Sequence, residues 1–157
     1  MLKLSYENST KKREVQEYIF SRVRNRVIAG LPGPDIKTYL EILGRHKFNK
    51  ALLYENSPRI LAHQIQQRPN CPLVFGNILE HLKKGPFYDL DFCCSIKSIL
   101  LYLKKIVELE SYALTLSLRP IGEEKTCAIF KEYMKDGQEI PYFIYKDTTP
   151  MITFYSL

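Results

Sequence analysis

The chain has 157 residues, 45% of them hydrophobic and 25% charged, which is the composition of an ordinary globular protein. That length predicts one domain spanning residues 1–157, and no run of 18 apolar residues is present that would cross a membrane. The net charge of +6 and the isoelectric point of about 9.1 favour anionic partners in general.

The cysteines indicate neither a disulfide framework nor a metal site. Cys71, Cys93, Cys94 and Cys127 form no Cys-x-x-Cys pair, so we expect no bound zinc and no other metal. The first residues lack the apolar segment of a secretory signal. We therefore expect a cytoplasmic protein with reduced thiols, in which Cys93 and Cys94 are small buried side chains.

A basic amphipathic helix is predicted for residues 9–24. Val15, Tyr18, Ile19 and Val23 recur at helical spacing and mark its buried face. The same region carries a cluster of cations, Lys11, Lys12, Arg13, Arg22, Arg24 and Arg26. Such a cluster forms either a solvated helix face or a patch that contacts the phosphates of a nucleic acid, and the sequence leaves both open.

Apolar runs that end in glycine or in polar residues predict the strands of a sheet. They occupy residues 26–35, 51–55, 72–78 and 87–92. Their ends carry Gly30, Glu55, Asn77 and the pair Asp89 and Asp91. An open parallel sheet binds its ligand at the carboxyl ends of its strands, so these residues are expected at one edge.

Helical patterns alternate with these runs, at residues 35–44, 58–65, 77–84, 95–107 and 123–135. In the second of them, Ile60, Leu61 and Ile65 are expected to face inward. Residues 112–118 predict a buried strand, and residues 141–145 and 151–155 predict an antiparallel hairpin. The whole pattern predicts an α/β fold of three layers, α-β-α, whose sheet is mostly parallel with one antiparallel strand in the C-terminal hairpin.

This order of elements resembles the Rossmann-like S-adenosylmethionine-dependent methyltransferases, whose seventh strand is inserted antiparallel between the fifth and sixth. The resemblance covers roughly residues 24–157 and is to small members of phage or mobile-element type. It implies S-adenosylmethionine as the cofactor and methyl transfer to an acceptor that the sequence does not identify, with nucleic acid as one candidate.

The resemblance also implies roles for individual residues on the cofactor side. Gly30 and Gly33 would form the floor beneath the methionine part of the cofactor, in a turn that departs from the family by its two prolines and by lacking Gly-x-Gly. Glu55 would accept hydrogen bonds from the ribose hydroxyls, with Asn56 beside it at the adenosine edge. Gly76 and Asn77 would meet the adenine amino group.

Asp89 and Asp91 are the catalytic candidates that the resemblance implies. Strand alternation places both carboxylates on the same side of their strand. One of them would orient or deprotonate the methyl-accepting group.

Every one of these assignments has a structural alternative. The glycine turn is also an ordinary strand-to-helix loop, and Glu55 and Asn77 are also suited to capping the helices that follow. The rival function is a non-catalytic methyltransferase-like protein that docks on nucleic acid or a protein partner through its basic helix. Binding of a nicotinamide dinucleotide is disfavoured because no Gly-x-Gly-x-x-Gly follows the first strand.

Overall fold

Strands and helices alternate along the part of the chain that the computed structural model describes, which is residues 3–5, 11–135, 138–146 and 148–157. The strands are β1 (Lys3–Ser5), β2 (Val27–Gly30), β3 (Lys50–Glu55), β4 (Leu73–Phe75), β5 (Phe87–Asp91), β6 (Tyr112–Ser117), β7 (Tyr142–Lys146) and β8 (Pro150–Ser156). The α-helices are α1 (Lys12–Phe20), α2 (Ile36–Gly44), α3 (Pro58–Gln67), α4 (Leu100–Val107) and α5 (Gly122–Tyr133). Two short 3-10 helices are η1 (Ile78–Glu80) and η2 (Ile96–Ile99).

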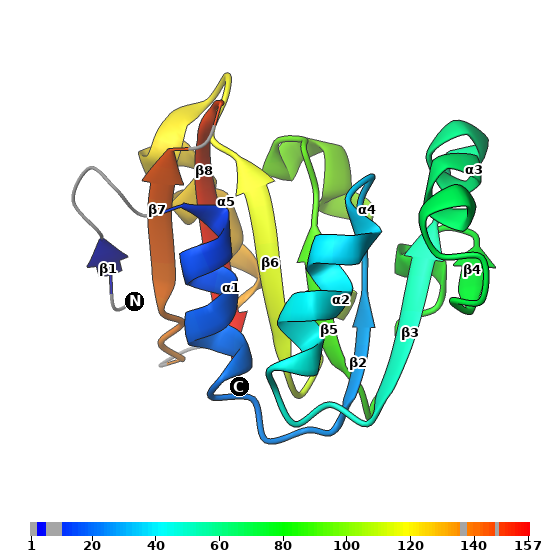
Figure 1. The fold of residues 1–157 in the computed structure, drawn as a ribbon. Helices are drawn as coiled ribbons and strands as arrows, with labels where there is room; N and C mark the ends of the chain where they lie inside the picture. The colour runs from blue at the N-terminus through cyan, green and yellow to red at the C-terminus, as the bar shows by residue number, and fades with distance from the viewer. Residues whose placement is uncertain (1–2, 6–10, 136–137, 147) are drawn as a thin grey trace.

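All these strands belong to one mixed sheet, in the order β1-β7-β8-β6-β5-β2-β3-β4 (Figure 1). The pairs from β4 across to β6 are parallel, and β8 lies antiparallel between β6 and β7. With β1 set aside, this is the order 3-2-1-4-5-7-6 of a seven-strand sheet whose last strand is antiparallel. The predicted fold class is therefore confirmed.

Helices cover both faces of the sheet and give the molecule three layers (Figure 1). On one face, α1 and α2 bury Val15, Ile19, Phe20, Ile36, Tyr39, Ile42 and Leu43. On the other face, η2, α4 and α5 bury Ile96, Ile99, Leu103, Ile106 and Phe130. Alternation along β6 sends Ala113 into the first cluster and Leu114 into the second, as expected for a strand buried on both sides.

Local capping explains where two of the helices begin. The Asp35 carboxylate accepts a hydrogen bond of 3.1 Å from the Thr38 amide at the start of α2. At the start of α3, the Ser57 hydroxyl accepts from the Ile60 amide, and Pro58 occupies the first turn. Both caps hold loops at the carboxyl edge of the sheet in fixed conformations.

Several helices differ from their predicted form. The basic helix covers Lys12–Phe20 rather than residues 9–24, and its predicted start lies outside the described residues. The helix predicted for 77–84 is the single 3-10 turn η1, and the one predicted for 95–107 begins as the 3-10 stretch η2.

The inward face predicted for α3 is wrong at Ile65, which is 47% exposed. Its neighbour Gln64 is fully buried instead, because its amide nitrogen donates a 2.6 Å hydrogen bond to the carbonyl of Gly33. A polar side chain is therefore buried to hold a loop, which apolar periodicity does not reveal.

Strand β1 was not predicted, since a three-residue run is too short to show a period. Among the described residues, none of the helices has the length and apolarity needed to cross a membrane.

Candidate active site

The carboxyl edge of the sheet brings the ends of β2, β3, β4 and β5 together. In the sheet register, Gly30 at the end of β2 lies beside Asp89 of β5. Glu55 at the end of β3 pairs with Phe75 of β4, and the next amide, that of Gly76, donates 2.9 Å to the Glu55 carbonyl. The residues that the sequence singled out therefore share this edge, although their side chains have different surroundings.

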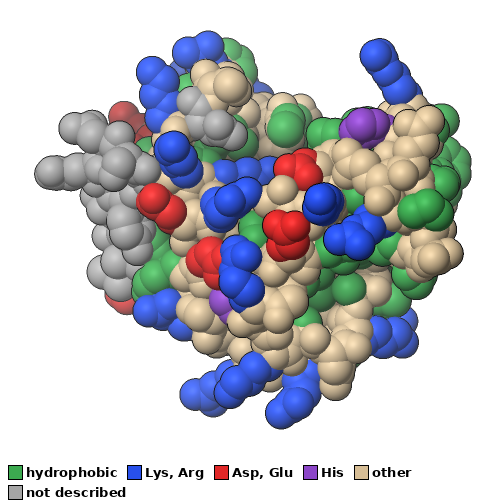
Figure 2. All heavy atoms as spheres, in the orientation of Figure 1, with side chains coloured by type: hydrophobic (Ala, Val, Ile, Leu, Met, Phe, Trp, Pro, Cys, Tyr) green, Lys and Arg blue, Asp and Glu red, His purple; other side chains and the backbone are tan. Residues whose placement is uncertain are grey.

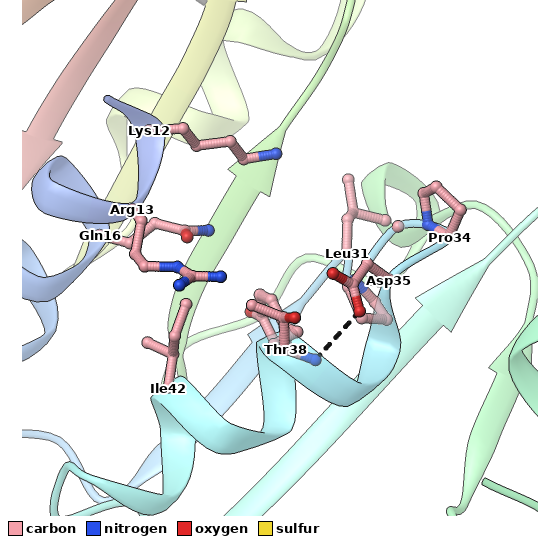
Figure 3. Close-up of a pocket in the computed structure, with 11 residues that line it drawn as sticks. Lys12, Arg13, Gln16, Leu31, Pro34, Asp35, Thr38 and Ile42 are labelled. Atoms are coloured by element: carbon pink, nitrogen blue, oxygen red, sulfur yellow. Dashed lines mark hydrogen bonds between the residues drawn. The ribbon is translucent and has the colours of Figure 1, made fainter. Parts of the chain in front are cut away.

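The glycine turn after β2 borders a cavity of about 320 Å³. Leu31, Pro32, Gly33, Pro34 and Asp35 form one wall, while Lys12, Arg13 and Gln16 project from α1 on the other side (Figure 3). Gly33 has a φ of +69°, a conformation that favours glycine, and nothing lies within 4 Å of the position a Cβ would take. The turn is thus held by backbone geometry and by Gln64, with open space in front of it.

Gly30 has a different reason to be glycine. A Cβ at this position would lie 2.2 Å from the hydroxyl oxygen of Tyr39. That hydroxyl passes over Gly30 and donates a 2.8 Å hydrogen bond to Oδ2 of Asp89. Gly30 does not line the cavity beside the turn, so in this structure it makes room for Tyr39.

Asp89 is a buried carboxyl group, with 3% of its surface exposed. Burial, and next the repulsion from Asp91, raise its pKa to about 7, although the Tyr39 hydrogen bond and Lys12 act in the opposite direction. Tyr39 is itself enclosed, and burial together with Asp89 raises the pKa of its phenol well above the usual range. The pair forms a polar contact inside the apolar cluster beneath α1 and α2.

Asp91, two residues further along β5, is less deeply buried than Asp89, and its carboxylate forms an ion pair with Lys12 of α1. Burial by itself lowers the pKa of the Lys12 ammonium, but attraction to Asp91 outweighs it and the pKa is raised. Lys12 was predicted as one of a cluster of exposed cations that forms either a solvated face or a phosphate-contacting patch. Its salt bridge ties α1 to the strand that carries both candidate catalytic carboxylates.

Lys12 lines two hollows at this edge. One is the cavity beside the glycine turn, and the other, of about 240 Å³, is lined by Asp91, Cys93, Ser117, Tyr145, Thr148, Thr149 and Met151. Cys93 is exposed and Cys94 is half-buried, so the prediction that both are buried was wrong for Cys93. Among the described residues, no three His, Cys, Asp or Glu side chains converge on a position where a metal ion would be held.

Glu55 and Asn56 lie at the end of β3, outside both hollows. The Glu55 carboxylate is buried, and its Oε1 accepts hydrogen bonds of 3.1 and 3.0 Å from the amides of Asn56 and Ser57. No hydrogen bond from the described residues reaches its other oxygen. The side chain thus shapes the loop with one oxygen and keeps the second for another donor, while Asn56 is exposed.

Gly76 and Asn77 also lie outside both hollows. The Asn77 side chain accepts 3.0 Å from the Leu79 amide and so caps η1. Asn77 therefore caps a helix, which is one of the two roles predicted for it. The Tyr54 ring and the His81 ring stack beside this loop, with centroids 5.4 Å apart.

Sequence reasoning missed three residues that organise this edge: Lys12 as the partner of Asp91, Tyr39 as the partner of Asp89, and Gln64 as the support of the glycine turn. Tyr39 occupies an apolar helix position, where its hydroxyl gives no signal of its own. The partners of Lys12 and Gln64 are remote in the chain, so no local pattern marks them.

Neither protein-family models nor the curated proteins contain a match to this chain. Solved structures do match. A protein of Streptococcus pneumoniae assigned as a tRNA (m1A22) methyltransferase, solved with S-adenosyl-L-methionine, superposes with a TM-score of 0.67 at 13% identity, over 93% of this chain and 71% of that one. An rRNA methylase of Streptococcus thermophilus superposes with a TM-score of 0.57 at 13% identity, over 92% of both chains.

A third match limits what this likeness shows. The spermidine synthase of Thermotoga maritima superposes with a TM-score of 0.61 at 14% identity, over 92% of this chain and 60% of that one. At such identities the likeness shows the fold alone, because one fold hosts different reactions. The chain has the Rossmann-like fold found in S-adenosylmethionine-dependent methyltransferases.

Proposed function

We propose that this chain binds S-adenosylmethionine at the carboxyl edge of its sheet and transfers the methyl group to an acceptor, with nucleic acid as the candidate class. The observation that carries the proposal is the cavity beside the Gly33 turn, placed where a sheet of this order binds its ligand. The low-identity neighbours include RNA methyltransferases, and the net charge of +6 favours an anionic acceptor.

The residues present fit such a cofactor in a definite arrangement. The Gly33 turn leaves room for the methionine part, and Arg13 faces the cavity where it can pair with the amino acid carboxylate (Figure 3). The second oxygen of Glu55 is the acceptor for the ribose hydroxyls. Gly76 and Asn56 border the nucleoside side, and Asn77 would contribute there only by giving up its cap on η1.

When bound, the cofactor supplies a methyl group on a positively charged sulfur, whose carbon–sulfur bond breaks as the bond to the acceptor forms. The protein's task is to hold the two groups in line and to accept the proton that the acceptor loses. Asp91 is better placed for this than Asp89, since it lines the second hollow whereas Asp89 is buried behind Tyr39. Lys12 pairs with Oδ2 of Asp91, which leaves Oδ1 as the oxygen that would accept the proton.

The direct test measures the binding of S-adenosylmethionine, its demethylated product and NAD by calorimetry and by thermal denaturation. Ligand at 100 times its dissociation constant adds about 2.7 kcal/mol of stability. We expect the first two ligands to raise the melting temperature and NAD to leave it unchanged. Absence of heat and of a melting shift at millimolar cofactor would overturn the proposal.

Glu55→Gln separates a ribose contact from a structural role. Glutamine keeps one oxygen for the Asn56 and Ser57 amides, so the loop should stay folded, but an NH2 group replaces the second oxygen and the charge-assisted hydrogen bonds from the two hydroxyls are lost. Such bonds contribute ~1.5–3 kcal/mol each, so cofactor affinity should fall at least tenfold. Asp91→Asn is the matched control and should reduce turnover while sparing affinity. Equal cofactor affinity for Glu55→Gln and the wild type would show that Glu55 does not hold the ribose.

A non-catalytic binding protein is the second candidate. It is favoured by one observation: both candidate catalytic carboxylates are already engaged, Asp89 by Tyr39 and Asp91 by Lys12. On this alternative the chain binds nucleic acid or a protein without cofactor, and the calorimetry above separates the two. A cytoplasmic location, consistent with four free cysteines, and the phage or mobile-element type belong to the proposal as well.

A further inference from the structure

A second basic hollow lies at the opposite end of the molecule, where α1 and α2 end and β2 begins. It has a volume of about 470 Å³ and is lined by Phe20, Ser21, Arg22, Val23, Arg24, Arg26, Arg45, His46 and Lys47. Four of the chain's eight arginines are in this lining, and no carboxylate is. Figure 2 shows Lys and Arg side chains projecting along the lower margin of this view, while the Asp and Glu side chains lie higher.

Most of the charge in this basic hollow is uncompensated. Glu17 pairs with Arg45 and His46, and hydrogen bonds from these two side chains lower the pKa of Glu17 against the effect of its burial. Four further cations, Arg22, Arg24, Arg26 and Lys47, are exposed, and none has a carboxylate partner among the described residues.

One of these cations is already oriented. The Arg22 guanidinium donates to the Tyr18 carbonyl at 2.9 Å and to the Ser21 hydroxyl at 3.1 Å, and its carbon lies 3.5 Å from the centre of the Tyr18 ring. A guanidinium held in this way loses less conformational freedom when it binds an anion. The remaining N–H groups of Arg22 are donors for such a ligand.

We propose that this basic hollow binds the phosphate groups of a nucleic acid backbone. Guanidinium groups match phosphate oxygens in two-point hydrogen bonds, and arginine supplies most of the lining charge. An anionic membrane is a poorer fit because the surface is concave and carries none of the exposed large apolar side chains, which are Ile65, Val74, Phe75, Leu100, Leu101 and Leu157.

This site is separate from the proposed cofactor site and does not rest on it. The nine residues of α1, at 1.5 Å of rise each, place its two ends ~13 Å apart. Lys12 at one end is paired with Asp91, while Arg22 follows the other end. The single basic patch predicted from residues 11–26 is thus divided between opposite edges of the sheet.

The test compares two triple variants that remove the same charge. Arg22→Gln, Arg24→Gln and Arg26→Gln alter the basic hollow, whereas Lys97→Gln, Lys104→Gln and Lys105→Gln alter exposed positions on or next to α4, on the other face of the sheet. Affinity for labelled single-stranded RNA and duplex DNA is measured by fluorescence anisotropy over a salt series. For duplex DNA, the slope of log affinity against log salt should fall by ~0.9 for each lost phosphate contact, or up to ~2.7 for the arginine variant.

We expect the lysine variant to keep the wild-type slope. Equal losses in the two triple variants would mean that only net charge matters, and would overturn the site. So would a wild type that binds neither nucleic acid at low salt, or one that prefers anionic vesicles or an acidic peptide. Cofactor-induced melting shifts should be the same in all three proteins, which keeps this test apart from that of the proposed function.

Discussion

Asp89→Asn is expected to stabilise the protein, by an amount that grows with pH. Asparagine has nearly the same volume and keeps an oxygen to accept the Tyr39 hydrogen bond, so the substitution removes an ionisable group with little change in packing. In the folded protein the Asp89 pKa is about 7, against 3.8 for the ordinary group. The folded state therefore binds a proton that the unfolded state has released throughout this interval.

The sign and size follow from that difference. Because folding raises the Asp89 pKa, the wild type has its full stability below about pH 4, where Asp89 is protonated in both the folded and the unfolded state. Its free energy of unfolding falls as the pH rises to about 7. The interval between 3.8 and about 7, at 1.36 kcal/mol per pH unit, amounts to ~4 kcal/mol. The Asp89→Asn variant does not lose this stability. The difference between its free energy of unfolding and that of the wild type should therefore rise from near zero at about pH 4 to ~4 kcal/mol at about pH 8.

Urea denaturation of both proteins at a series of pH values from 4.5 to 8.5 measures the difference. Asp35→Asn is the control, since it makes the same chemical change at an exposed cap whose pKa is lowered, chiefly by hydrogen bonds from Thr38. That contribution is lost only as the pH falls through the acid range, so the control's difference from wild type should be constant above about pH 5. A constant difference for Asp89→Asn as well would refute the raised pKa and the burial that causes it.

Two further substitutions test the packing around the site. Gly30→Ala should cost ~1–3 kcal/mol of stability because its methyl group meets the Tyr39 hydroxyl. The cost should be much smaller in a Tyr39→Phe background, where the closest remaining ring carbon is 3.3 Å away. Thermal denaturation of the wild type, the two single variants and the double variant measures the coupling, and additive effects would contradict the contact. Tyr112→Phe should be neutral or stabilising by ~1 kcal/mol, since its buried hydroxyl has no partner among the described residues. Tyr142→Phe removes a hydrogen bond to Glu123 and should lower the free energy of unfolding. If both substitutions lower it, the Tyr112 hydroxyl is hydrogen-bonded and the expectation is wrong.

The positions of β2, β3 and β5 along the chain were predictable because each of these strands ends in a recognisable residue pattern, whereas their order in the sheet came from the family resemblance. Gly30 and Gly33 mark the end of β2, Glu55 the end of β3, and Asp91 the end of β5. Alternation along β5 placed Asp89 and Asp91 on one side, and both line the narrow space beneath Lys12. These are properties of neighbouring residues in the chain, which local patterns record.

The burial of the site residues and the side chains that they contact were not predictable in the same way. Asp89 and Asp91 share a face, but Tyr39 hydrogen-bonds to the first and Lys12 pairs with the second, so Asp89 is fully enclosed while Asp91 is only partly buried. Both partners come from helices on one side of the sheet, and their identity depends on how those helices pack. The cap formed by Asn77 is a local contact, and the sequence favoured it and adenine recognition equally.

The position of β8 has a consequence for how the chain assembles during synthesis. Among the described strands, β7 joins the sheet through β8, and β1 joins through β7. Strands β2 to β6 can pair as they emerge, but Lys3–Ser5 has no place in the sheet until residues 150–156 have been made. Among the described strands, the one nearest the N-terminus thus joins the sheet only after the one nearest the C-terminus. Until then the edge of β6 stays unpaired, and a chain arrested before residue 150 would expose it to pairing with other chains.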